Sequence, residues 1–305
     1  MRLRLSFSNI LAYCFLSHSV ALLSQPEIMV SVINKGTVFQ SLPFFSKTAG
    51  ENIRYSVYLP PDYYSAPDSF PVLYLLHGLG GNENSWLNDF AVSRIADSLI
   101  TGNVMPSMII IMPDGRKSYF INDYNNAFPY ETIFIDELIP YIDSKYKTKT
   151  GKPFRAIGGL SMGGYGALIH CIRHPDHFAA AISLSAAVRT DSMIMNEKPE
   201  KYNQIFKPLY GDSIQLFRTV THHWTENNPL VQVALRPETL TTIRWYLDCG
   251  FSDYLLQGNE ALHDVLTQYK IPHEYHIRPG NHNKAYWESV LVPALLFTGR
   301  VFEGR

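Results

Sequence analysis

The feature that most constrains this chain is a glycine-rich stretch, residues 158–164, with a serine at its centre. Residues 159–163 read Gly-Leu-Ser-Met-Gly and match the G-x-S-x-G pattern of a nucleophile elbow. In such a turn between a strand and a helix, side chains two positions away from the serine would collide, and the serine adopts a strained conformation at a helix N-terminus. The motif therefore predicts an exposed, nucleophilic Ser161. The rest of the chain must then supply a base, an acid and an oxyanion hole.

The overall composition is that of an ordinary globular protein. The chain has 305 residues, of which 46% are hydrophobic and 17% are charged. This length suits one large α/β domain or two small ones, and the composition argues against disorder. The formal net charge is −1 and no basic stripe is present, so nucleic acid is not an expected partner.

The first 24 residues predict a secretory signal peptide. Residues 1–4 are basic, residues 5–23 are mostly apolar, and Ser19-Val20-Ala21 offers a small-x-small cleavage pattern. An uncleaved N-terminal anchor is the rival interpretation, whereas lipid attachment at Cys14 is disfavoured because bulky Tyr13 precedes it. No later segment has the roughly 18 apolar residues of a transmembrane helix. We therefore expect a secreted or periplasmic protein with no stable membrane span after signal removal.

Strands and helices are predicted to alternate from about residue 37 onward. Two partly alternating segments, 37–47 and 53–60, predict antiparallel strands. Further strands are predicted at 71–76, 108–112, 154–157, 179–184, 242–247 and 274–277. Helices are predicted at about 88–100, 131–145, 165–172, 254–269 and 285–297. This order predicts an α/β fold with a mainly parallel central sheet, helices on both faces, and ligands at the carboxyl ends of the strands.

Residues 185–237 interrupt this alternation with several prolines and short helical patches. A segment of about fifty residues makes a poor separate core. We therefore expect a single domain over residues 25–305, with residues 185–237 as an insertion over the active-site end of the sheet.

His282 is the predicted base for Ser161. A serine hydroxyl is a weak nucleophile unless an imidazole accepts its proton, and in this kind of fold the order is serine, acid, histidine. The histidine should follow the last strand, and His282 lies in such a loop. His273 and His276 lie in or beside the strand itself and are poorer candidates.

The acid that orients this imidazole is less determined by the sequence. Asp248 is expected at the end of the preceding strand, and Asp253 lies in the loop that follows. Both would face the carboxyl edge of the sheet. The loop position favours Asp253, and the other carboxylate is then expected to accept hydrogen bonds from loop amides.

The oxyanion hole is predicted to consist of two backbone amides. One is the amide of Met162, which follows the nucleophile, and the other is that of Leu79 in the loop 77–81. A plain glycine turn is the alternative for this loop. His77 is expected to brace the loop rather than take part in the chemistry.

These segments together resemble the esterase D and feruloyl-esterase-like group of α/β-hydrolases, which includes carbohydrate esterases, tributyrin esterases, S-formylglutathione hydrolases and mycolyltransferases. The resemblance is carried by residues 72–81, Ser85-Trp86, 112–115, 158–167, 248–250, Asp253, 279–280, His282 and Tyr286-Trp287. It implies an α/β-hydrolase fold, the acid at Asp253, and oxyanion amides at Leu79 and Met162. Such proteins often have Gly before the histidine and Asp after it, whereas this chain has Asn281 and Asn283. That loop therefore indicates no substrate preference.

The expected function is that of a serine carboxylesterase that works through an acyl-enzyme and requires no metal or cofactor. The substrate is expected to be a small-molecule or polysaccharide-linked ester, and the resemblance implies acetyl or feruloyl esters of plant polysaccharide. An acyltransferase of the mycolyltransferase type and an S-formylglutathione-type thioesterase stay open as alternatives. A non-catalytic binding protein is disfavoured, because it would not need the complete set of Ser161, Asp253 and His282.

Four aromatic residues near the predicted catalytic edge are candidate walls of the substrate pocket, with ordinary packing as the alternative. They are Trp86, Tyr119, Phe120 and Trp287.

No metal site or disulfide framework is predicted. His222-His223 has no further ligand at a usable spacing, so a solvated pair is favoured. After removal of the signal peptide, Cys171 and Cys249 remain, and we expect two buried free thiols.

Overall fold

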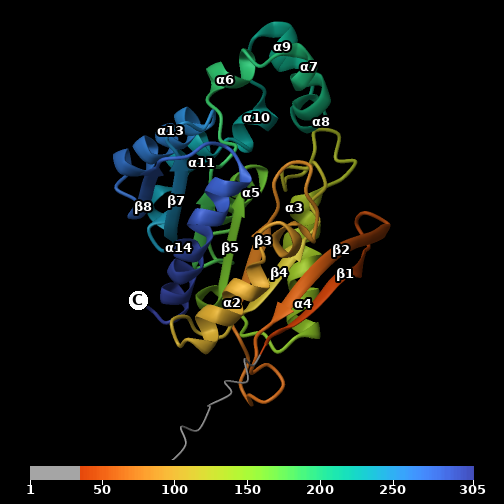
Figure 1. Ribbon diagram of the computed structural model, residues 1–305. Helices are drawn as coiled ribbons and strands as arrows, with labels where there is room; N and C mark the ends of the chain where they lie inside the picture. Colours follow the sequence, from red (N-terminus) through yellow and green to blue (C-terminus); the bar gives the residue numbers. More distant parts are fainter. Residues whose placement is uncertain (1–34) are drawn as a thin grey trace, which may run out of the picture. The chain divides into compact units, whose positions relative to one another are not determined.

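The fold is organised around one eight-stranded sheet with the order β1-β2-β4-β3-β5-β6-β7-β8 (Figure 1). The computed structural model describes residues 35–305, so the predicted signal peptide lies outside the described residues. The strands are β1 (Thr37–Ser46), β2 (Glu51–Leu59), β3 (Val72–Leu76), β4 (Ile109–Pro113), β5 (Arg155–Leu160), β6 (Ala180–Leu184), β7 (Arg244–Gly250) and β8 (His273–Arg278). β1 and β2 pair antiparallel, and β2 pairs antiparallel with β4. Strands β3 to β8 are parallel, which confirms the predicted α/β fold.

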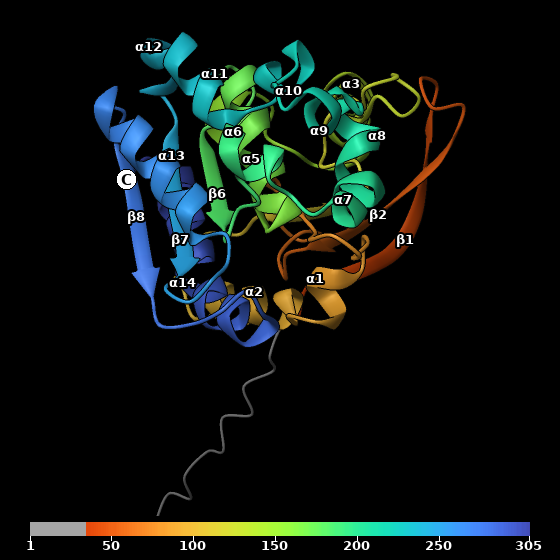
Figure 2. The same ribbon diagram turned by 90° about the horizontal axis from the view of Figure 1, so that it is seen from above.

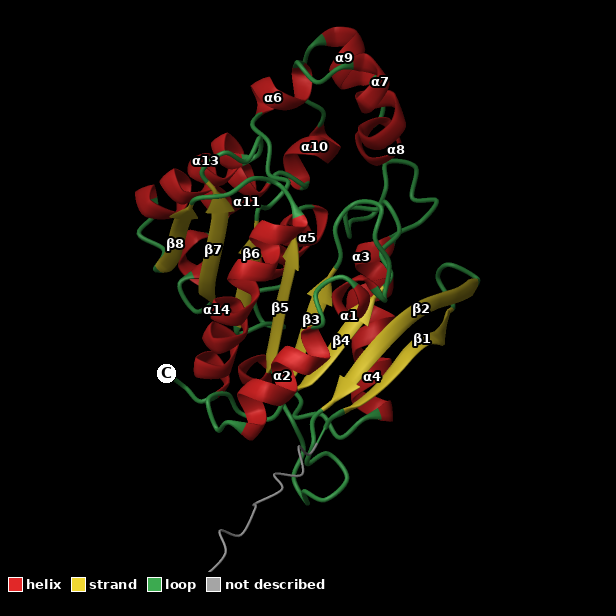
Figure 3. Cartoon of the chain, viewed as in Figure 1, coloured by secondary structure: helices red, strands yellow, loops and turns green. Residues whose placement is uncertain are grey.

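Helices cover both faces of this sheet, as Figures 2 and 3 show. The principal helices are α2 (Val92–Thr101), α4 (Ile139–Lys145), α5 (Met162–Arg173), α13 (Leu256–Gln268) and α14 (Lys284–Phe302). Side chains alternate between the faces along each strand. Leu73 and Leu75 of β3 pack in one core with α2 and α14, whereas Val72, Tyr74 and Leu76 pack in the other core with α4, α5 and α13.

Two predicted helices are interrupted. The helix predicted at 88–100 begins only at Val92, as α2, and residue 88 is instead the last residue of the short helix α1 (Ser85–Asn88). Ala91 between the two helices has a left-handed backbone with φ of 49°. The segment at 131–145 runs as α3 (Tyr130–Thr132), a π-helical stretch (Ile133–Leu138) and α4. Pro140 follows the π-helical stretch, and its missing N–H removes one α-helical hydrogen bond there.

The segment between β6 and β7 folds into short helices. They are α6 (Asp191–Met195), α7 (Pro199–Lys201), α8 (Lys207–Tyr210), α9 (Ser213–Phe217), α10 (His222–Glu226), α11 (Pro229–Leu235) and α12 (Pro237–Leu240), with a π-helical stretch (Tyr202–Phe206) before α8. In Figure 1, α7, α8 and α9 lie beyond the carboxyl end of β5. Buried Tyr210, Trp224 and Val233 join the segment to the core on the α5 face of the sheet.

Both cysteines of the described residues are free and buried, as predicted. Burial raises the pKa of the Cys249 thiol to about 12, so this thiol stays protonated. Among residues 35–305, none of the helices is long and apolar enough to cross a membrane.

Candidate active site

Ser161 lies at the sharp turn from β5 to α5. Its backbone has φ of 54° and ψ of −115°, a conformation that residues other than glycine rarely adopt. A Cβ on Gly159 would lie 2.4 Å from the carbonyl carbon of Gly163, and a Cβ on Gly163 would lie 2.2 Å from the Leu76 carbonyl oxygen. Any larger residue at either glycine would therefore clash with backbone atoms, which cannot move aside as a side chain could.

A chain of hydrogen bonds joins Ser161 to the histidine and to one of the two candidate acids. His282 Nε2 lies 2.9 Å from Ser161 Oγ, and His282 Nδ1 lies 2.8 and 3.0 Å from the two carboxylate oxygens of Asp253. The Asp253 side chain is fully buried, and Oδ1 also accepts the Leu255 amide. The structure thus brings together the three residues that the sequence predicts as a triad.

The loops that carry Asp253 and His282 are joined along their backbones. The amide of Phe251 donates to Arg278, and the amide of Ser252 donates to Gly280 at 2.9 Å. A Cβ on Gly250 would lie 2.6 Å from the Gly280 carbonyl oxygen, so the two loops touch directly. This contact holds the acid within hydrogen-bond distance of the imidazole.

Asn283 has a helix-capping role next to the histidine. Its Oδ1 accepts the amide of Tyr286 at 3.0 Å at the start of α14. Asparagine and aspartate are comparable N-cap residues. The departure from the family pattern at this position therefore preserves the helix start.

Asp248 lies inside β7 and makes a separate buried network. Its carboxylate accepts Arg278 Nε at 2.8 Å, Tyr246 OH at 2.9 Å and the hydroxyl of Tyr286. Burial and the carboxylate together raise the pKa of both tyrosines. The expectation that the second carboxylate binds loop amides is wrong, because these side chains occupy it. Asp248 thereby joins β7 to β8 and to α14.

The two amides predicted for the oxyanion hole have no acceptor among the described residues. Met162 is the first residue of α5, so its N–H has no acceptor within the helix. Leu79 lies in the loop after β3 and lines the same cavity as Ser161.

His77 braces the loop that contains Leu79. Its Nδ1 lies 2.8 Å from the Gly78 carbonyl oxygen, and its Nε2 accepts the Gly115 amide at 2.9 Å. This pattern assigns the proton of a neutral ring to Nδ1. Through these two contacts the buried ring joins the loop after β3 to the loop after β4.

Ser161 and His282 open into a cavity with a volume of about 610 Å³. Of the four predicted wall residues, Trp86 and Trp287 line it. The Trp287 ring stands edge-on to His282 with centroids 4.9 Å apart, and Phe90 lies between the two tryptophans. Sequence reasoning missed Phe90, which was expected inside a helix.

Tyr119 and Phe120 do not line this cavity. Phe120 is fully buried, and its ring occupies the space that side chains at Gly115 and Gly166 would need. Tyr119 packs edge-on against Tyr165 in the core.

Two further observations concern the wall of this cavity. Tyr254, also missed, lines the cavity 4.7 Å from the His282 ring, and its position next to Asp253 in the sequence was the signal that could have found it. None of the described residues of the insertion, 185–237, lines the cavity.

No group of three or more metal-ligating side chains is present within residues 35–305. His222 is exposed and pairs with Glu226 at 3.1 Å. His223 points elsewhere, with Nε2 3.2 Å from the Asn122 carbonyl oxygen. The pair therefore does not converge on one point.

The chain belongs to the Esterase family, described as "Putative esterase", whose pattern it matches over residues 46–298. It is 35% identical to an endo-1,4-beta-xylanase/feruloyl esterase of Xylanibacter ruminicola over 56% of this chain and 24% of that protein. It is 27% identical to an acetyl esterase of Caldicellulosiruptor saccharolyticus over 85% of this chain and 97% of that protein. Among solved structures, a ferulic acid esterase superposes with a TM-score of 0.75 and 28% identity, covering 88% of this chain and 99% of that one.

These comparisons confirm the predicted α/β-hydrolase fold and the esterase class. The chain spans about a quarter of the length of the xylanase/feruloyl esterase and nearly all of the acetyl esterase.

We expect Asp248→Asn to reduce the free energy of unfolding by about 1–3 kcal/mol, because buried hydroxyls and Arg278 would lose a charged acceptor. Asp264→Asn is the matched control, since Asp264 is exposed on α13 and its change should stay within about 0.5 kcal/mol. Urea denaturation of both variants measures the difference. Equal stability of the two variants would contradict the structural role of Asp248.

Proposed function

We propose that the protein is a serine carboxylesterase that acts through an acyl-enzyme. The observation that carries this proposal is the continuous set of hydrogen bonds from Ser161 through His282 to Asp253 at the floor of an open cavity. A nucleophile, a base and an orienting acid at these distances form the arrangement that activates a serine hydroxyl.

In the proposed reaction, Ser161 Oγ attacks the ester carbonyl carbon while His282 Nε2 accepts the hydroxyl proton. The tetrahedral intermediate collapses, the bond to the alcohol oxygen breaks, and His282 returns the proton to the departing alcohol. Asp253 keeps the other ring proton on Nδ1 and stabilises the imidazolium. Water then repeats these steps on the acyl-enzyme and releases the acid.

The amides of Leu79 and Met162 are the proposed donors to the developing oxyanion. Both are free of other acceptors in the described chain, and Met162 also lies at the positive end of the α5 dipole. The ring of His77 fixes the loop that carries the Leu79 amide. Such donors stabilise the transition state because they need no rearrangement as the charge develops.

We infer that the acyl group is acetyl or feruloyl and that the alcohol belongs to plant polysaccharide. The named activities of the two relatives and of the solved ferulic acid esterase support this substrate class. The volume of about 610 Å³ and the aromatic wall of Trp86, Phe90 and Trp287 would accommodate an aromatic acid as well as acetate. The predicted signal peptide supports export to where such polysaccharide is found.

Ser161→Ala is expected to lower the hydrolysis of p-nitrophenyl acetate by at least about 10³-fold, because the nucleophile is lost. The same variant should lose labelling by a fluorophosphonate. Ser252→Ala is the control, since this exposed serine lies one residue from Asp253. Activity of Ser161→Ala equal to that of the wild type would rule out the assignment.

Asp253→Asn should reduce kcat by about 10³–10⁴-fold, because the amide no longer holds the required imidazole tautomer. Asp248→Asn serves as the comparison. At a temperature at which this variant is still folded, its kcat should fall much less than that of Asp253→Asn. Steady-state kinetics on p-nitrophenyl acetate measure both effects. A larger loss in Asp248→Asn would exchange the proposed roles of the two carboxylates.

Comparison of p-nitrophenyl acetate, methyl ferulate and S-formylglutathione tests the substrate class. The two oxygen esters should be hydrolysed with a higher kcat/KM than the thioester. A preference for S-formylglutathione would favour the thioesterase alternative. Addition of an alcohol acceptor should leave free acid as the main product, and a new ester as main product would indicate an acyltransferase.

A further inference from the structure

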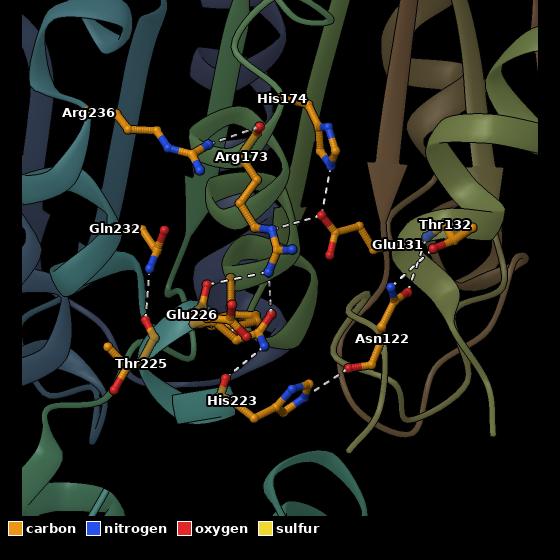
Figure 4. A network of polar contacts seen from close by, with 12 residues as sticks. Asn122, Glu131, Thr132, Arg173, His174, His223, Thr225, Glu226, Gln232 and Arg236 are labelled. Carbon is orange, nitrogen blue, oxygen red and sulfur yellow. Dashed lines mark hydrogen bonds and ion pairs between the residues drawn. The ribbon is translucent and has the colours of Figure 1, made fainter. Parts of the chain in front are cut away.

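A second cavity of about 280 Å³ lies between the loop that precedes α3 and the helices α5 and α10. It shares no lining residue with the cavity at Ser161. Its walls are mostly polar and are formed by Asn122, Asp123, Tyr124, Asn126, Glu131, Arg173, His223, Glu226 and Asn227. Figure 4 shows the polar network around it.

The deepest charged group of this cavity is Glu131, whose residue is only 6% exposed. Its Oε1 forms an ion pair with Arg173 Nε at 2.9 Å and lies 2.7 Å from His174 Nε2. Its Oε2 is buried and has no hydrogen-bond partner among the described residues. In Figure 4 this second oxygen points into the space between Arg173 and Asn122.

An unpaired buried carboxylate oxygen costs free energy unless a donor reaches it. Burial alone raises the pKa of Glu131, but His174 and Arg173 outweigh this effect and hold that pKa below its usual value. The carboxylate is therefore ionised and can only accept hydrogen bonds. A donor group on a molecule bound in the cavity would satisfy this oxygen.

Donors and an aromatic surface lie around this acceptor. Arg173 reaches across to Asn227 Oδ1 at 3.1 Å and keeps its guanidinium on the cavity wall. The Asn126 side chain makes no hydrogen bond within the described residues and is free to donate and accept. Tyr124 is 47% exposed, and its ring stands edge-on to His223 with centroids 5.7 Å apart.

The charges at the walls disfavour an ionic ligand. A divalent cation would face the Arg173 guanidinium, which already binds Glu131, and this part of the described chain holds no three-ligand group. An anion would face the carboxylates of Asp123, Glu131 and Glu226. A neutral molecule with several hydroxyls can both donate to Glu131 and accept from Arg173.

We propose that this cavity binds one sugar residue of a carbohydrate chain. A sugar hydroxyl donates to Glu131 Oε2, a second oxygen accepts from Arg173, and the apolar face of the sugar packs on Tyr124. The choice of a plant polysaccharide as the chain rests on the proposed function. Attachment at this second point raises the local concentration of ester groups near Ser161, as in other bivalent binding.

Titration of the full protein with unesterified xylohexaose in a calorimeter tests the proposal. We expect saturable binding in the wild type and binding weakened by about tenfold or more in Tyr124→Ala and in Glu131→Gln, which each remove one partner of the sugar. Tyr64→Ala is the matched control, because Tyr64 is 69% exposed and lines neither cavity, and it should bind as the wild type does.

Tyr124→Ala keeps the test valid if Glu131→Gln folds poorly, since Glu131 also binds Arg173 and His174. Lack of binding in the wild type, or equal binding in the wild type and Tyr124→Ala, would overturn the proposal. Loss of binding in Trp287→Ala but not in Tyr124→Ala would place the sugar in the catalytic cavity and would also overturn it.

Hydrolysis of p-nitrophenyl acetate separates this proposal from the proposed function. Both cavity variants should hydrolyse this small ester at the wild-type rate but release less acyl group from esterified xylan. If the wild type hydrolyses the small ester and does not bind xylohexaose, the sugar site fails and the esterase assignment stands. If xylohexaose binds and no ester is hydrolysed, the sugar site stands and the esterase assignment fails.

Discussion

The close backbone approach between β3 and the start of α5 is the constraint on which the rest of the site depends. Gly163 lies so near the Leu76 carbonyl that even a methyl group would not fit between them. This contact allows the sharp turn from β5 into α5, at which Ser161 has a φ of 54°. Because Leu76 is the last residue of β3, the same contact brings the loop of Leu79 alongside the helix N-terminus. One steric requirement thus places the candidate nucleophile and both candidate oxyanion amides together.

Asp248 in β7 and Asp253 in the loop after it show how the environment gives the same side chain different roles. Asp248 is surrounded by hydroxyls and by Arg278, all from the strands and helix that it joins. Asp253 has a backbone amide and the imidazole of His282 as partners. The first carboxylate is saturated by groups that stabilise the fold. The second carboxylate also contacts the imidazole of His282, a group that can take up and release a proton.

Much of the fold and of the candidate site was predictable because the signals are local. The strands predicted at 71–76 and 108–112 appear within a residue or two of their true bounds, because buried parallel strands are continuous apolar runs. Ser161 and His282 follow from a turn motif and from loop order, whereas loop position only favoured Asp253 over Asp248 and the family resemblance supplied the rest of that choice. The division of the helix at Ala91 could not be predicted, since nothing in the residue type requires a left-handed conformation there.

The pocket walls were harder to predict because they depend on contacts between distant segments. Phe120 is drawn into the core by the space above Gly115 and Gly166, and the second glycine is far away in the sequence. The insertion was expected over the active-site end of the sheet; the amide of Ala187 donates to the Ser161 carbonyl oxygen, but none of the described residues of the insertion lines the cavity. Its helix α10 lines the second, polar cavity instead.

The paired loops after β7 and β8 have a consequence for how such a site can change. Their shared backbone hydrogen bonds, from Phe251 and Ser252 to the residues before His282, make the acid and the base parts of one rigid unit. An insertion or deletion in either loop would shift one partner against the other. Variation in length is therefore tolerated more easily around Trp86 and Phe90 and in the segment between β6 and β7. These segments carry none of the residues whose side chains link Ser161, His282 and Asp253. Diversity among proteins built in this way should concentrate there, while the lengths of the two joined loops change together.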